Sequence, residues 1–223
     1  MEILHTAPAF VVCRKAPGEV SEHTPDENSL PVLLEKELGQ KIYPVHRLDC
    51  TTGGLMVFAL TQSAAADLSA QMQDGTFHKT YLAVVHGKMD GAAGTLEDEL
   101  FFDRRKGKSF VCDKKRSGTK TARLEYGVLG ESEEHGGVSL CKVELFTGRT
   151  HQIRVQFGSR KHPLLGDGKY GSRSNCKDCS LWSAKLGFRI PGGKEKLTFT
   201  DIPPANRAFG VFESIINREE KTF

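Results

Sequence analysis

Residues 45–60, VHRLDCTTGGLMVFAL, carry the pattern that decides the fold of this chain. Their second half, Leu55–Leu60, is a short apolar run of the kind that forms a buried strand. Asp49 precedes that strand, and the small residues 51–54 between them predict a tight turn. A carboxylate held at the mouth of a buried strand is positioned, and an ionised, positioned carboxylate can act as a nucleophile. The alternative is a solvated or capping aspartate beside a turn.

Outward from this stretch, the sequence alternates between helix-like and strand-like periodicity, and hairpin connections outnumber crossovers. We therefore expect one α+β domain over residues 1–223, with a mixed, mostly antiparallel β-sheet flanked by helices and loops. A polar loop is expected at 18–28. The expected strands are 9–13, 55–60, 78–87, 119–129, 138–146, 181–190 and 196–200, and the expected helices are 29–38, 61–72, 149–157 and 207–221.

The formal net charge of the 223-residue chain is only +3, so its overall charge does not point to a polyanionic partner. Any surface for nucleic acid must then be a local patch of cations. Three clusters qualify, although each on its own is more typical of an ordinary solvated loop: 104–108, 114–116 and 160–162.

The N-terminus lacks a basic segment followed by a long apolar run, and no stretch approaches 18 apolar residues. This predicts a cytoplasmic protein that is neither secreted nor membrane-spanning. The six cysteines are expected to be reduced thiols. Cys176 and Cys179 have the spacing of a metal knuckle, but no second pair completes a zinc site, so an ordinary loop is expected. His46 and His151 lack companion ligands and are expected to form structural hydrogen bonds.

A second segment dense in hydrogen-bond donors is 147–154, TGRTHQIR. If the chain is helical from Arg149, the side chains of Thr150, Arg154 and Phe157 share one face. A partly buried arginine on that face needs a carboxylate or phosphate partner. The alternatives are a structural salt bridge or an exposed basic side chain.

Four segments occur in a fixed order: 45–55, 79–87, 148–154 and 162–171. With them the chain resembles the RluA-type family of RNA pseudouridine synthases, from about Ala9 to Pro203. The match is most specific around Asp49 and between 148 and 171. The resemblance implies a pseudouridine synthase-like catalytic domain. Because the first strand is expected near Ala9, we expect no N-terminal S4 RNA-binding domain.

The resemblance also implies roles for individual residues. Asp49 corresponds to the family's essential aspartate, and Arg47 to the arginine that enters the RNA stack where the target base has left. Tyr81 corresponds to the tyrosine that packs against the target uracil, and Arg154 to the arginine that ion-pairs with the catalytic aspartate. Leu181 corresponds to the leucine that lines the base pocket.

The chain departs from the family's pattern at three places. Gly53 stands where the family usually has Ser, and Trp182–Ser183 stands where it usually has His-Ala. Ile190 replaces the usual His before Pro191. These departures concern the pocket wall and the choice of substrate rather than the nucleophile.

The leading interpretation is isomerisation of specific uridines in structured RNA, an rRNA or tRNA stem-loop, by a monomer that needs no cofactor, metal or obligatory protein partner. Two alternatives stay open. One is a catalytically silent RNA-binding or folding module on the same scaffold, and the other is an unrelated hydrolase that uses Asp49 with Asp167 as its second carboxylate. The sequence leaves open which uridine is modified, and whether Asp49 attacks the ring or assists at the ribose.

Overall fold

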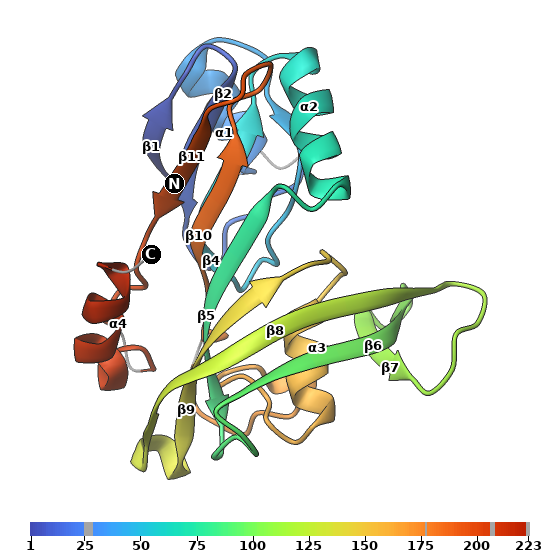
Figure 1. Cartoon of the computed structure of the whole chain (residues 1–223), viewed down its shortest axis with the longest axis vertical. Coiled ribbons are helices and arrows are strands. Elements are labelled where there is room, and N and C mark those ends of the chain that lie inside the picture. The colour runs from blue at the N-terminus through green and yellow to red at the C-terminus, as the bar shows by residue number, and fades with distance from the viewer. Residues whose placement is uncertain (25–28, 177, 206–207, 222–223) are drawn as a thin grey trace. The chain divides into compact units, whose positions relative to one another are not determined.

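The computed structural model describes residues 1–24, 29–176, 178–205 and 208–221. The chain packs as two compact units (Figure 1). Unit 1 contains residues 1–79 and 182–202, and unit 2 contains residues 80–181 and 203–222. The expected single domain over 1–223 stays a prediction.

The strands of unit 1 form a mixed sheet. Its strand order is β1-β2-β4-β10, with β3 paired to β4 and β11 paired to β10. All these pairs are antiparallel except β4 with β10, where Gly53 and Gly54 lie opposite Trp182 and Ser183. The bounds are β1 Glu2–Thr6, β2 Phe10–Lys15, β3 Tyr43–Pro44, β4 Gly53–Ala59, β10 Leu181–Arg189 and β11 Lys196–Thr200.

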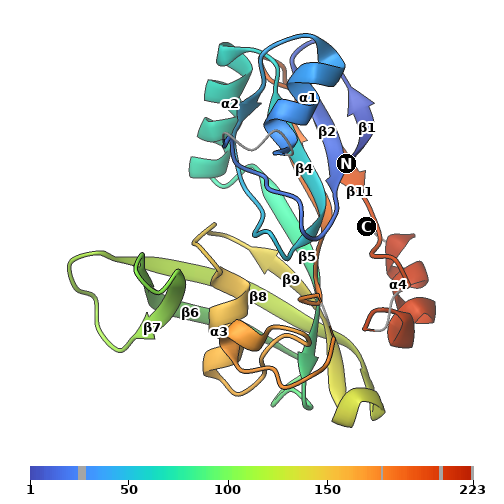
Figure 2. The same cartoon turned by 180° about the vertical axis from the view of Figure 1, so that it is seen from behind.

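Two helices belong to unit 1: α1 Leu30–Leu38 and α2 Gln62–Gln73 (Figure 2). Helix α1 ends at Leu38, and Gly39 after it adopts the left-handed conformation that commonly ends a helix. Helix α2 begins after Thr61, whose hydroxyl accepts a hydrogen bond from the Ala64 N–H. Its Leu68 packs with apolar residues of β2, β4 and β10, which confirms the predicted amphipathic helix.

Unit 2 is built on an antiparallel sheet of order β5-β9-β8-β6-β7. Helix α3, Gln152–Ser159, packs on this sheet through Val155, in a core with Leu100 and Ala122. Helix α4, Glu213–Glu220, packs where Gly130 leaves room for Ile215. The strand bounds are β5 His78–His86, β6 Ala93–Asp103, β7 Lys108–Cys112, β8 Thr119–Ser132 and β9 Val138–Leu145.

The predicted fold class, α+β with a mixed and mostly antiparallel sheet, is confirmed. Several predicted boundaries are wrong. The strand predicted over 9–13 is present as β2, Phe10–Lys15, but the strand before it, β1 Glu2–Thr6, escaped prediction because it is exposed and mostly polar. The strands of the β6–β7 hairpin were not predicted either. The C-terminal α-helix begins at Glu213 after a single 3₁₀ turn, Gly210–Phe212, and the start predicted at Arg207 lies outside the described residues, as do 25–28 of the predicted 18–28 loop.

Candidate active site

Asp49 lies in a turn directly before β4, as the sequence predicts. The Thr52 N–H donates to the Asp49 carbonyl over 2.9 Å and closes this turn, which we call the Asp49 turn (residues 48–54). Gly54 has φ +107°, and a Cβ there would lie 2.4 Å from the Ser183 carbonyl oxygen. Only glycine fits where β4 and β10 approach this closely.

A buried lysine holds the Asp49 turn from the inside. Lys15 has no exposed surface, and its Nζ donates to the carbonyls of Thr52 at 2.7 Å, Cys50 at 3.0 Å and Ala16 at 3.1 Å. Burial lowers the pKa of Lys15 to about 8, against the attraction of nearby negative groups that include Asp49. The three bonds satisfy all three ammonium hydrogens and fix the backbone on both sides of the turn.

Lys15 was not predicted from the sequence to support the site. A usable signal was present in the alternation of β2, where Val11, Cys13 and Lys15 share one face while Arg14 lies on the other. A lysine in line with two apolar residues at the end of a buried strand is expected to be buried and to need several acceptors.

A serine fixes the start of the Asp49 turn. The Ser21 hydroxyl donates to the Leu48 carbonyl at 2.7 Å and accepts from the Leu48 N–H at 3.2 Å. The Gly18 N–H donates to the Cys50 carbonyl at 2.7 Å. These hydrogen bonds fix the backbone around Asp49, which is itself half-buried.

The residues just before Asp49 differ in their surroundings. His46 Nε2 accepts a hydrogen bond from the Val57 N–H at 3.0 Å, which is the structural role expected for it. Burial, together with the nearby Lys79, lowers the pKa of His46 to about 3, so its ring stays neutral. Arg47 is exposed, and its Nη1 pairs with Glu22 at 2.7 Å.

Two departures from the family pattern explain each other. A Cβ on Gly53 would lie 2.2 Å from Cζ3 of Trp182, so a serine cannot stand at 53 while the indole occupies its present place. The Trp182 indole N–H donates to Asp201 at 3.1 Å, and Asp201 also accepts from Arg14. The Trp182 side chain therefore fills the space that a side chain at position 53 would occupy.

Arg154 lies on α3 and is buried. Its Nε and Nη2 donate to the two oxygens of the buried Asp167 at 2.6 and 2.9 Å, a bidentate ion pair. Its guanidinium carbon lies 5.3 Å from the ring centre of Tyr170. Both carboxylate oxygens of Asp167 are used to hold Arg154, which does not favour Asp167 as a general acid.

The helix that carries Arg154 begins at Gln152 rather than at the predicted Arg149. His151 has φ 56°, which is outside the helical region, and the Gln152 side chain accepts from the Arg149 N–H at 3.0 Å. Thr150 therefore precedes the helix, and the face predicted to contain Thr150, Arg154 and Phe157 is wrong in its first member. His151 Nδ1 lies 2.9 Å from the Tyr170 hydroxyl, the structural contact expected of it.

Tyr81 and Leu181, the two predicted pocket residues, are both nearly buried. Tyr81 lies on β5 opposite Val143 of β9. Leu181 follows Ser180, whose carbonyl accepts from the Val84 N–H of β5 at 3.0 Å. The structure thus brings the segment that ends at Leu181 against the strand that carries Tyr81.

Arg154, Tyr81 and Leu181 belong to unit 2, whereas Asp49 and Arg47 belong to unit 1. The ion pair expected between Asp49 and Arg154 therefore stays a prediction. No cluster of three or more metal-binding side chains occurs within residues 1–24, 29–176, 178–205 and 208–221. None of the six cysteines, all of which lie in the described residues, forms a disulfide.

Among the described residues, no helix combines the length and apolarity needed to cross a bilayer.

A family model described as RNA pseudouridylate synthase matches residues 8–159.

The chain is similar to several curated bacterial proteins. It is 34% identical over 180 residues to an uncharacterized RNA pseudouridine synthase of Mycoplasma pneumoniae, covering 78% of this chain and 56% of that one. It is 31% identical over 212 residues to the dual-specificity RNA pseudouridine synthase RluA of Pasteurella multocida, covering 92% and 94%. The chain spans about half the length of the first three curated relatives.

Among solved structures, the chain is similar to human RNA pseudouridylate synthase domain containing 1. The TM-score is 0.78 at 22% identity, over 92% of this chain and 84% of that one. At this identity the likeness shows the fold alone.

Proposed function

The chain belongs to the RluA-type RNA pseudouridine synthases, and we propose that it isomerises specific uridines in a structured RNA with Asp49 as its nucleophile. The observation that carries this proposal is the construction of the Asp49 turn. Three carbonyl contacts from a buried lysine and two hydrogen bonds from a serine fix the backbone around one half-buried carboxylate. A solvated surface aspartate has no need of such support.

The reaction balances without a redox partner or group carrier. The bond from ribose C1′ to uracil N1 breaks, the ring turns, and a bond forms from C1′ to C5. The hydrogen on C5 is lost to solvent as a proton, and N1 gains a proton. A carboxylate can assist by adding to the uracil ring or by attacking C1′, as in a retaining glycoside hydrolase. Both routes require Asp49 in its ionised form.

The other site residues take supporting roles in this proposal. Arg154 pairs with Asp49 and favours the ionised carboxylate. The bidentate contact with Asp167 orients the guanidinium for this purpose. Tyr81 packs against the uracil, and Leu181 lines the base pocket.

The target uridine must leave its stack for its atoms to be reached. Arg47 fills the gap, because a guanidinium stacks on neighbouring bases. This role suits an exposed arginine that pairs with the exposed Glu22. An rRNA or tRNA stem-loop is the proposed substrate, since unpaired loop bases flip at the lowest cost. One relative is named a tRNA pseudouridine synthase. The protein acts in the cytoplasm as a monomer without a cofactor.

The test is tritium release from RNA that carries C5-tritiated uridine, because each turnover frees that hydrogen. Asp49→Asn is expected to abolish release while RNA binding is retained. Asp90→Asn changes the same functional group at an exposed position and is expected to leave turnover unchanged. Equal release by the Asp49→Asn protein would refute the assignment. Binding by the wild type without any release would favour the silent module, and free uracil as the product would favour a hydrolase.

The substrate itself requires a cellular experiment. Pseudouridines are mapped in ribosomal and transfer RNA from cells with and without the gene. We expect one or a few sites to disappear, and the Asp49→Asn gene is expected not to restore them.

A further inference from the structure

The hairpin of β6 and β7, with the loop that leads to β8, concentrates positive charge. This segment, residues 99–118, is called the basic hairpin here. It holds seven of the chain's 31 Lys and Arg residues and three of its 28 Asp and Glu residues. The net charge of the hairpin is thus +4 while the whole chain has +3, so the rest of the chain sums to −1. A polyanion is attracted to such a local excess of cations.

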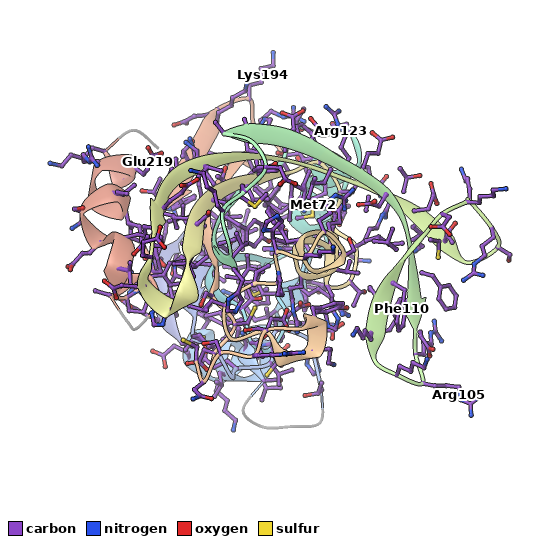
Figure 3. The ribbon with its side chains drawn as sticks, turned by 90° about the horizontal axis from the view of Figure 1, so that it is seen from below. Met72, Arg105, Phe110, Arg123, Lys194 and Glu219 are labelled. Atoms are coloured by element: carbon purple, nitrogen blue, oxygen red, sulfur yellow. The ribbon has the colours of Figure 1, made fainter. Side chains whose placement is uncertain are left out.

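Lys108 donates to the Lys169 carbonyl, and the other six cations of the basic hairpin are exposed. Within the described part of the chain, no ion pair neutralises any of six exposed side chains: Arg104, Arg105, Lys106, Lys114, Lys115 and Arg116. Figure 3 shows Arg105 at the tip, pointing away from the hairpin ribbon. The tip is ordered, because Asp103 accepts hydrogen bonds from the backbone N–H groups of Arg105 and Lys106.

Aromatic rings lie among these cations. Phe101 and Phe110 are directly opposite each other in the β6–β7 register, so they share one face of the hairpin. The Lys106 ammonium lies 5.4 Å from the Phe110 ring centre, and the Arg116 guanidinium lies 5.5 Å from the Phe101 ring centre. Rings interleaved with cations are the usual surface on which unpaired bases stack.

The opposite face of the hairpin is joined to the candidate site. The Ser109 N–H donates to the Tyr170 hydroxyl at 2.8 Å, and the Ser109 hydroxyl donates to the Thr150 carbonyl. Tyr170 is the same residue whose ring lies against the Arg154 guanidinium. One layer of side chains therefore separates the aromatic face from the unit 2 part of the site.

We infer that the Phe101–Phe110 face of the basic hairpin binds unpaired nucleotides that flank the modified uridine. The two rings and the Arg116 guanidinium stack on bases, and the lysines contact phosphates. This inference rests on the proposed function for the identity of the polyanion. It gives the substrate a requirement, which is single-stranded RNA next to the target.

The experiment measures binding of a fluorescently labelled, uridine-containing stem-loop RNA and of the same strand annealed to its complement. Phe110→Leu keeps the apolar bulk and removes the ring. We expect it to raise Kd for the stem-loop about fivefold and to change Kd for the duplex little. Phe110→Tyr keeps the ring and is expected to bind like the wild type. Equal stem-loop affinity for Phe110→Leu and Phe110→Tyr would overturn the stacking role.

The charges are tested through the salt dependence of Kd. Lys114→Gln/Lys115→Gln is expected to lower the slope of log Kd against log salt by about 0.7 for each phosphate that the variant no longer neutralises. The matched control is Lys194→Gln/Lys196→Gln on exposed lysines of unit 1, which changes the total charge equally and is expected to keep the wild-type slope. Equal slopes for both double variants would overturn the inference.

Single-turnover tritium release at saturating RNA separates this inference from the proposed function. Hairpin variants are expected to keep the wild-type rate once RNA is saturating, since they affect binding alone. A wild type that binds through the hairpin but releases no tritium would remove the proposed function and leave the binding surface. If the wild type releases tritium but the hairpin variants bind RNA as tightly as the wild type, the proposed function stands and the hairpin is not the binding surface.

Discussion

The Asp49 turn and the basic hairpin use charged residues in opposite ways. In the turn, one lysine is fully buried and each of its ammonium hydrogens meets a carbonyl. In the hairpin, lysines and arginines are numerous, exposed and left for a partner to neutralise. The charge of the turn lysine is fixed during folding, at a cost in desolvation, whereas the hairpin cations stay hydrated, as the proposed binding of a polyanion requires.

The largest expected effect comes from exchanging a lysine for methionine in each region. Lys15→Met leaves three carbonyls without their donor and is expected to lower the free energy of unfolding by about 3 kcal/mol. Lys114→Met in the hairpin is expected to change it by less than about 0.5 kcal/mol. Urea denaturation of both proteins measures the contrast. Similar values for the two variants would show that Lys15 does not support the turn.

A smaller effect is expected at the end of the turn. Gly53→Ser places a Cβ into the Trp182 indole and is expected to lower the free energy of unfolding by about 2 kcal/mol. Gly127→Ser, where a Cβ meets nothing within 4 Å, serves as the control.

Combining Gly53→Ser with Trp182→His tests the pairing directly. The loss in free energy of unfolding of the double variant is expected to be smaller than the sum of the two single losses, by about 1 kcal/mol or more. Additive costs in urea denaturation would mean that the two positions are independent.

The pH dependence of stability probes His46. An unfolded histidine binds a proton below about pH 6.5, whereas the pKa of His46 in the folded protein is lowered to about 3. Between these values acid protonates the unfolded chain first, so stability falls as pH falls, by at most about 1.4 kcal/mol for each pH unit. His46→Gln is expected to flatten the slope between pH 6.5 and 5 in urea titrations.

The smallest expected effect concerns Arg47. Its exposed pair with Glu22 contributes less than about 1 kcal/mol. Glu22→Gln is expected to leave stability unchanged and, because Arg47 no longer has to leave a partner, to lower Kd for the stem-loop RNA about threefold. Glu37→Gln removes an equal charge on α1 as the control. Tighter binding by both variants would indicate general charge rather than release of Arg47.

The Asp49 turn was predicted well from the sequence because its signals are local. A buried apolar strand preceded by small residues is visible in a few positions, and both appear in the structure as Gly53–Ala59 and the turn before it. The basic hairpin escaped because its strands show no regular alternation of apolar and polar residues and bury only one face against Tyr170 and α3. The helix at Arg154 was placed three residues early because its start depends on side-chain contacts across the 147–152 turn.

What the sequence determined by itself was the family, the α+β class and the identity of the candidate nucleophile, since each rests on residues close together in the chain. Only the tertiary structure decided what surrounds them. It paired Gly53 with Trp182, buried Lys15 beneath the Asp49 turn and joined Arg154 to Asp167. The physical reason is that packing and burial bring residues that are distant in the sequence into contact. The size and shape of a side chain's neighbours therefore cannot be predicted from its own segment.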